Sequence, residues 1–133
     1  MYCIVTSNAY IFALQLKIMN IENSKAQLRK GILEFCALAL LQKEEAYPSD
    51  LLNSLKEAEL IVVEGTLYPL LSRLKNAGLL TYRWEESKSG PPRKYYSLTE
   101  QGRVFYGELA TSWVELRDAV DKVVLENKSP EKK

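Results

Sequence analysis

Apolar residues recur at helical spacing along most of the chain, beginning at its first residues. In the first 18 residues, one face of such a helix carries Val5, Ala9, Phe12 and Leu16. This spacing predicts an additional amphipathic helix within an N-terminal extension, residues 1–23. A second hypothesis is that translation starts at Met19 and that the preceding stretch is upstream read-through. On either hypothesis an apolar face is expected to pack rather than to carry out chemistry.

A central core helix is predicted to follow. Ser24 and Gln27 have the spacing of a capping box, which predicts a helix start at Ser24. The expected buried face carries Leu28, Ile32, Phe35 and Ala39. Further apolar residues fill other sides of this helix, which is typical of a helix in a protein core. We expect it to end near residues 42–43.

Two more helices are predicted downstream. Pro48 suits the first turn of one of them, because its missing N–H needs no partner there. A β-branched triplet at 61–63 predicts a short strand. The next helix opens within residues 65–69 and is expected to stop near Ala77, because Gly78 tolerates the positive φ of a C′ residue.

A β-hairpin is expected after that helix. Residues 79–84 and 93–98 are predicted as its strands, with residues 85–92 as a turn-rich loop between them. The aromatic residues of the strands are expected to pack as cross-strand pairs; they are Tyr82, Trp84, Tyr95 and Tyr96. Thr99 suits the N-cap of a final helix.

The final helix has the clearest periodicity of the chain. Its apolar residues alternate at spacings of three and four, the pattern of a coiled-coil seam. They are Tyr106, Leu109, Trp113, Leu116, Val120 and Val123. A seam of this length on a small domain requires a partner, and the same helix of a second copy is the expected one. Residues 99–126 are therefore predicted to form a dimerisation helix, followed by a polar tail, 127–133.

Composition excludes several classes of function. The 133-residue chain has no histidine, so histidine-based nucleophile activation and histidine metal sites are excluded. Its two cysteines, Cys3 and Cys36, form no Cys-x-x-Cys pair, and Cys36 is expected to be a small buried apolar residue. We therefore expect neither an enzyme, nor a metal site, nor a cofactor. No apolar run is long enough to span a bilayer, which favours a cytoplasmic protein without membrane contact.

The predicted order of elements is that of a winged helix-turn-helix, a mainly α fold with a small β-hairpin (α+β). Two motifs, residues 65–79 (with the core Gly-Thr-Leu-Tyr-Pro) and residues 90–102 (from Gly-Pro-Pro-Arg-Lys to Thr-Glu-Gln-Gly), resemble PadR-type transcriptional regulators over about residues 24–124. The single C-terminal helix resembles the short subgroup of that family. The resemblance implies a homodimeric regulator, usually a repressor, that responds to small aromatic or drug-like molecules.

Residues 24–98 are accordingly predicted to bind double-stranded DNA. A helix fits the major groove, and a glycine at its start lets the backbone approach phosphate. Hydroxyls and cations on this helix, on the hairpin and on the core helix supply the other expected contacts. The predicted DNA-binding residues are Gly65, Thr66, Tyr68, Ser72, Arg73, Lys75, Lys88, Arg93, Lys94, Arg29 and Lys30.

Two further interpretations remain open at the level of the sequence. Trp113 is expected either to fill the dimer core or to form a wall of a cavity for an aromatic effector. The near-neutral net charge of +1, together with Glu64, Glu85 and Glu86 beside the expected DNA face, also fits a winged-helix protein-interaction module that does not bind DNA.

Overall fold

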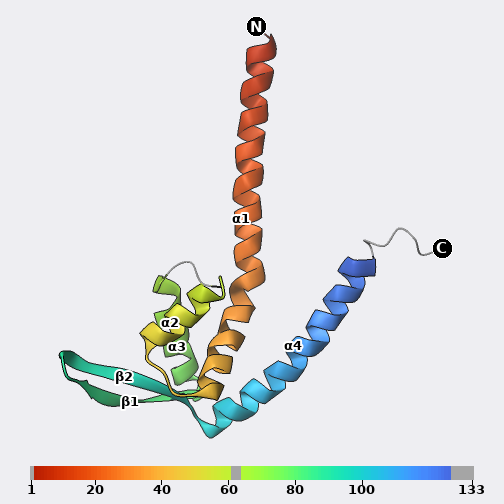
Figure 1. Ribbon diagram of the computed structural model, residues 1–133. Coiled ribbons are helices and arrows are strands. Elements are labelled where there is room, and N and C mark those ends of the chain that lie inside the picture. Colours follow the sequence, from red (N-terminus) through yellow and green to blue (C-terminus); the bar gives the residue numbers. More distant parts are fainter. Residues whose placement is uncertain (1, 61–63, 127–133) are drawn as a thin grey trace. The chain divides into compact units, whose positions relative to one another are not determined.

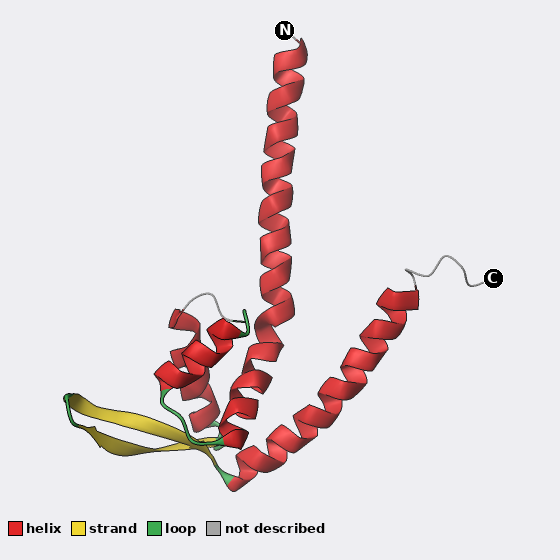
Figure 2. Cartoon of the chain, viewed as in Figure 1, coloured by secondary structure: helices red, strands yellow, loops and turns green. Residues whose placement is uncertain are grey.

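The computed structural model describes residues 2–60 and 64–126, so the strand predicted at 61–63 and the polar tail lie outside the described residues. It divides into two compact units, residues 1–33 and 34–133. The described elements are helices and one antiparallel hairpin of two strands (Figure 2), which confirms the predicted fold class.

Helix α1, Tyr2–Lys43, contains both the predicted N-terminal helix and the predicted core helix. The prediction of a helix start at Ser24 is wrong, because the helix continues through this position without interruption. No glycine or proline lies between residues 2 and 30, so nothing in the sequence stops the helix there. An ion pair between Lys25 Nζ and Glu22 Oε1, at 3.3 Å, spans the same turn. Such i,i+3 pairs stabilise a continuous helix.

The core of the second unit consists of leucines from three helices. These are the last turns of α1, then α2, Pro48–Glu57, and α3, Leu67–Asn76. The most deeply buried side chains are Leu38, Leu51, Leu55, Leu67, Leu71 and Leu74. The face predicted to be buried on the core helix is corrected at its first position, because Leu28 is 79% exposed. The buried contacts of α1 come instead from Ala37, Leu38 and Leu41.

Single residues with special stereochemistry set the helix ends of this unit. Pro48 occupies the first position of α2, and Asp50 Oδ2 accepts a hydrogen bond from the Tyr47 N–H at 3.3 Å. A 3₁₀ turn, Glu64–Thr66, leads into α3. Gly78 has a φ of +82° directly after the C-cap of α3, Ala77. The predicted start of α2 and the predicted end of α3 are both confirmed.

The hairpin is longer than the sequence predicted. Strands β1, Leu80–Ser87, and β2, Gly90–Leu98, take up most of the expected loop at residues 85–92. The prolines at 91 and 92 lie where the strand register shifts, between the Glu85–Arg93 and Ser87–Gly90 pairs, and such an irregularity interrupts the hydrogen-bond ladder that a proline cannot join. Ala46 and Tyr96 exchange backbone hydrogen bonds of 3.0 and 2.9 Å, which attaches the segment before α2 to β2.

Helix α4, Glu100–Glu126, follows the hairpin directly. Thr99 caps it as predicted: its Oγ1 accepts a hydrogen bond from the Gly102 N–H at 3.0 Å and donates one to the Gly78 carbonyl at 2.7 Å. Gly102 lies against the Leu79 carbonyl, where a Cβ would overlap the backbone. The cap and this close approach together fix the start of α4 beside the end of α3.

Candidate nucleic-acid interface

The β1–β2 hairpin, hereafter the wing, extends away from the three core helices of its unit (Figure 1). An open groove of about 520 Å³ lies between the wing, α3 and the start of α2. We call it the wing groove. Its lining residues are Tyr47, Pro48, Ser49, Tyr68, Ser72, Trp84, Arg93, Lys94 and Tyr96.

One face of the wing combines aromatic rings with cations. Tyr82 pairs with Tyr96 and Trp84 pairs with Lys94 in the strand register, so these four side chains share a face. Lys94 Nζ lies 4.6 Å from the ring centroid of Tyr82 and 5.6 Å from that of Trp84. Lys75 Nζ, from α3, lies 5.0 Å from the same Tyr82 ring. Two positive charges from different elements therefore meet at one aromatic ring.

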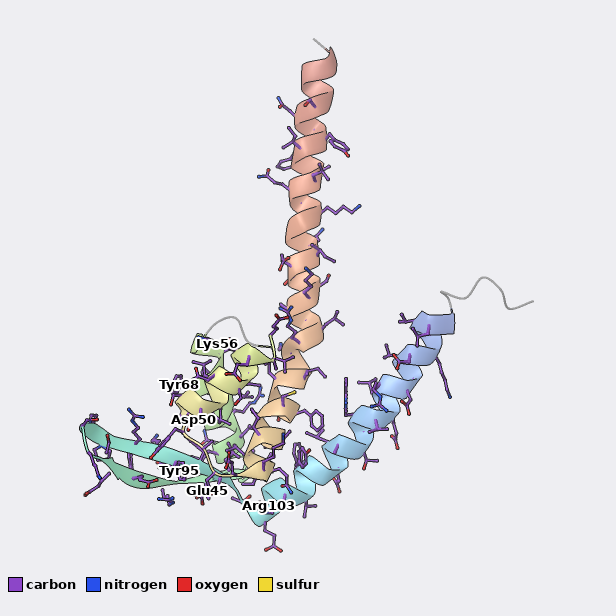
Figure 3. The ribbon with its side chains drawn as sticks, in the orientation of Figure 1. Glu45, Asp50, Lys56, Tyr68, Tyr95 and Arg103 are labelled. Atoms are coloured by element: carbon purple, nitrogen blue, oxygen red, sulfur yellow. The ribbon has the colours of Figure 1, made fainter. Side chains whose placement is uncertain are left out.

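The opposite face of the wing contains the acidic partners. Arg83 forms ion pairs of 3.2 Å with both Glu85 and Glu45, and its guanidinium lies 4.6 Å from the Tyr95 ring centroid. Figure 3 shows Glu45 and Tyr95 close together at the base of the wing. Desolvation raises the pKa of Tyr47, and the charge of Glu85 and a hydrogen bond with it raise that pKa further. Glu85 is thus held by groups on its own face.

The predicted aromatic packing is confirmed for one cross-strand pair. The ring centroids of Tyr82 and Tyr96 are 5.5 Å apart. Trp84 instead contacts Tyr82 on its own strand, edge to face at 5.9 Å. The Tyr95 ring packs on the ring of Tyr47, at 4.7 Å, rather than on another aromatic ring of the wing. This difference follows from the Ala46–Tyr96 pairing, which brings Tyr47 alongside β2.

Helix α3 presents a polar surface outside its leucine core. Thr66, Tyr68, Ser72, Arg73 and Lys75 are all exposed. Arg73 forms an ion pair with Glu34 at 3.0 Å, which ties α3 to α1 within the second unit.

The start of α3 has room for a close approach from outside. A Cβ built at Gly65 meets no atom of the described chain within 4 Å, so the chain itself does not require a glycine there. The open space is available to an external group.

Four of the predicted DNA contacts line the wing groove: Tyr68, Ser72, Arg93 and Lys94. Lys88 lies in the turn between the strands of the wing. Arg29 and Lys30 belong to α1 within the first unit, and of these two Lys30 is the more exposed.

The sequence did not single out Tyr47, Pro48 and Ser49 as site residues, although all three line the wing groove. Pro48 did mark the start of α2. No local pattern, however, indicates that this start returns to the wing, because the return depends on the Ala46–Tyr96 pairing between residues 50 positions apart.

A second aromatic cluster lies where α1 and α4 meet inside the second unit. The ring centroids of Phe35 and Tyr106 are 5.7 Å apart and stacked, and those of Phe35 and Trp113 are 6.2 Å apart. Trp113 is 36% exposed. Beyond it, the predicted seam of α4 is open to solvent at Leu116, Val120 and Val123. Cys36, predicted to be buried, is only partly buried, and this burial raises the pKa of its thiol.

The family model for PadR-like transcriptional regulators matches residues 37–108, which covers α2, α3, the wing and the start of α4. The chain belongs to this family. A PadR-like transcription factor from Bacteroides fragilis is 61% identical, covering 76% of this chain and 98% of its own, with a TM-score of 0.64. PadR-like regulators from Bacillus cereus (34% identical, 74% and 96% covered, TM-score 0.66) and Eggerthella lenta (35%, 82% and 96%, 0.71) are also similar.

The PadR-like family is one of transcriptional regulators, and the winged-helix fold is confirmed. Among the described residues, no helix is long and apolar enough to cross a membrane. Within that same part of the chain, no three histidine, cysteine or acidic side chains are grouped as metal ligands would be.

Proposed function

We propose that this PadR-family protein is a homodimeric, sequence-specific DNA-binding repressor of the cytoplasm, with α3 as its reading helix. The observation that carries the proposal is the meeting of Lys75 from α3 and Lys94 from the wing at the Tyr82 ring. Cations from a helix and a hairpin that meet at one aromatic ring are suited to the phosphates that border a major groove. Arg93 and Lys94 are the two cations that line the wing groove itself.

The exposed side chains of α3 fit the task of reading base edges. Tyr68 and Ser72 line the wing groove and supply hydroxyl groups that donate and accept hydrogen bonds. Thr66 and Gly65 precede them at the helix start, where the open space at Gly65 lets a phosphate approach the backbone. We propose that Arg73, held by Glu34, contributes positive potential there. Lys88, Arg29 and Lys30 are proposed as outlying phosphate contacts.

The arrangement of the acidic residues favours this function over that of a protein-interaction module. Glu85 is paired with Arg83 on the face of the wing opposite Lys94. Its charge is therefore directed away from the aromatic and cationic face. The net charge of the whole chain therefore does not describe the charge of this face, where Lys94 and Lys75 meet at Tyr82.

Dimerisation is proposed through the solvent-exposed seam of α4. Two such helices would bury Leu116, Val120 and Val123, which are 48–64% exposed in the single chain. A two-fold dimer would present two α3 helices to one face of DNA, where half-sites lie about 34–36 Å apart. Such an occupied site is proposed to exclude the transcription machinery, which accounts for repression.

Selection of bound duplexes from a random pool tests the proposal. We expect a two-fold symmetric consensus, and binding to it that weakens steeply with added salt because phosphates release counterions. A protein that recovers no consensus and shows no salt-dependent shift of any duplex would be an interaction module instead.

The aromatic cluster of Phe35, Tyr106 and Trp113 is proposed to receive a small planar aromatic effector. Such a ligand stacks on exposed indole surface and would alter DNA affinity only by binding two dimer shapes unequally. In a Trp84→Phe protein, which leaves Trp113 as the sole indole, we expect a planar aromatic compound to change the emission intensity or wavelength. Unchanged emission across a broad panel would leave Trp113 with a purely packing role.

A further inference from the structure

The first unit contains a long apolar stripe that the DNA-binding proposal does not use. With Ile4 as position a, the a and d positions of a heptad repeat run without interruption to Ile32 along α1. Seven of these nine positions are apolar: Ile4, Ile11, Leu14, Ile18, Ile21, Leu28 and Ile32. The two polar ones are Ser7 and Lys25. A helix of this length rises about 43 Å along its axis.

The stripe is open to solvent where its side chains are described. Ile11, Leu14, Ile21 and Leu28 are between 40% and 79% exposed. Leu28 and Ile21 are the informative members, because residues 20–31 are otherwise nearly all polar or small. In that polar stretch both large apolar residues fall at d. A second apolar stripe runs through Phe12, Leu16 and Met19. It ends there, because the next position at helical spacing is the polar residue Asn23.

The residue types of the stripe point to one kind of partner. Position a holds isoleucine four times out of five, and position d holds leucine at 14 and 28. β-Branched residues at a together with leucine at d favour parallel two-stranded coiled coils. The fifth a position is Lys25, and a single polar residue at a sets register and oligomeric state. Lys25 already pairs with Glu22 on its own helix at 3.3 Å.

The flanking charges are also complementary between two parallel copies. Lys17 lies at g and Glu22 at the following e, the two positions that face each other across a parallel pair in register. Two-fold symmetry makes this contact twice. An antiparallel pair would instead bring like positions together, e against e and g against g.

We propose that residues 4–32 of α1 pair with the same segment of a second copy as a parallel, in-register coiled coil. The family model matches residues 37–108, so residues 4–32 lie outside the part that it covers. The N-terminal seam adds a contact between copies to the one proposed for α4. The N-terminal extension is then a second dimerisation element of this protein.

Cysteine cross-linking in the full chain tests this pairing. Cys3→Ser and Cys36→Ala first remove the native thiols, and Leu14→Cys then places one thiol at d. An in-register pair brings the two Leu14→Cys chains within disulfide range, a Cα separation of about 4.4–6.8 Å. We expect Leu14→Cys to form a covalent dimer at least ~10-fold faster than the matched control Asn23→Cys, which lies at the outward position f.

Charge exchange supplies a second readout that does not depend on oxidation. A Lys17→Glu chain mixed with a Glu22→Lys chain should form mixed dimers above the statistical proportion, because every g–e′ contact then joins opposite charges. The doubly exchanged chain, Lys17→Glu/Glu22→Lys, should pair with itself as the native chain does. Native mass spectrometry counts the species, and circular dichroism verifies that each variant keeps its helix content.

Three results would overturn the proposal. The first is equal cross-linking rates for Leu14→Cys and Asn23→Cys. The second is cross-linking only when Leu14→Cys, at d, is mixed with a thiol at an a position such as Lys25→Cys, because an antiparallel pair brings a against d. The third is mixed dimers at the statistical proportion. If the extension binds lipid or another protein instead of a second copy, the two thiols should cross-link at equal rates and mixed dimers should form at the statistical proportion. DNA affinity is measured separately, so failure of the DNA-binding proposal leaves the cross-linking result intact.

Discussion

Replacement of Leu116 by aspartate is expected to lower the apparent DNA affinity by roughly 10²- to 10⁴-fold. Leu116 is 55% exposed in the single chain and lies in the middle of the α4 seam. A carboxylate there costs little in a separate chain but would be buried without a partner in a paired one. Without α4 pairing the two α3 helices are no longer held at a fixed spacing, so the gain from binding two half-sites is lost. Titration of a two-fold operator with native and variant protein measures the effect.

Val114→Asp is the matched control for this change. It introduces the same charge two residues away, at an exposed position outside the seam. Val114→Asp should leave the affinity for the operator and the molar mass of the dimer nearly unchanged. Sedimentation equilibrium is run in the native background and in an Ile11→Asp background, because the N-terminal seam is a separate proposed contact. An Ile11→Asp/Leu116→Asp protein that remains dimeric and binds the operator with native affinity would refute pairing through α4.

The sequence predicted best those features that depend on the stereochemistry of one residue. Pro48 is restricted to the first turn of a helix, Gly78 accepts a positive φ, and Thr99 offers a hydroxyl to a free N–H. Each of these conditions is local, so each marks an element boundary without knowledge of the fold. The winged-helix order followed from those boundaries.

The prediction failed where a short sequence motif is compatible with more than one local structure. Ser24 and Gln27 fit a capping box, but a cap forms only where a helix begins, and α1 passes through this segment with Glu22 and Lys25 paired across the same turn. The wing loop was predicted too long for a similar reason. Prolines 91 and 92 break a regular strand, but here they lie at a shift of the strand register, where the hydrogen-bond ladder is already interrupted.

Contacts between residues far apart in the chain could not be predicted from the sequence. Arg73 was predicted as a DNA contact, and its ion pair with Glu34, 39 positions earlier, has no sequence signature. The wing groove depends in the same way on the pairing of Ala46 with Tyr96. Residue type indicated that Arg93 and Lys94 are cations on a hairpin. Only the strand register shows that Lys94 shares a face with Tyr82 while Arg93 stands opposite Glu85.

That register makes the wing the sharpest place to test DNA binding by charge. A double change, Arg93→Gln/Lys94→Gln, removes two cations from each chain and four from a dimer. If each contacts a phosphate, the slope of log affinity against log salt should fall by about 3 to 4, and affinity near physiological salt should fall roughly 10- to 100-fold. Operator titrations at a series of salt concentrations give both quantities.

The fold of the double variant needs its own measurement, because Arg93 and Lys94 also lie over the rings of Tyr47, Tyr82 and Trp84. Such exposed cation–π contacts are worth about 0.5–1 kcal/mol each, so thermal unfolding should shift only slightly. Lys43→Gln/Lys122→Gln removes the same charge from exposed positions outside the wing and should leave the salt slope near its native value. Equal slopes for the two double variants would mean that the wing does not face phosphate, even if α3 still reads the operator.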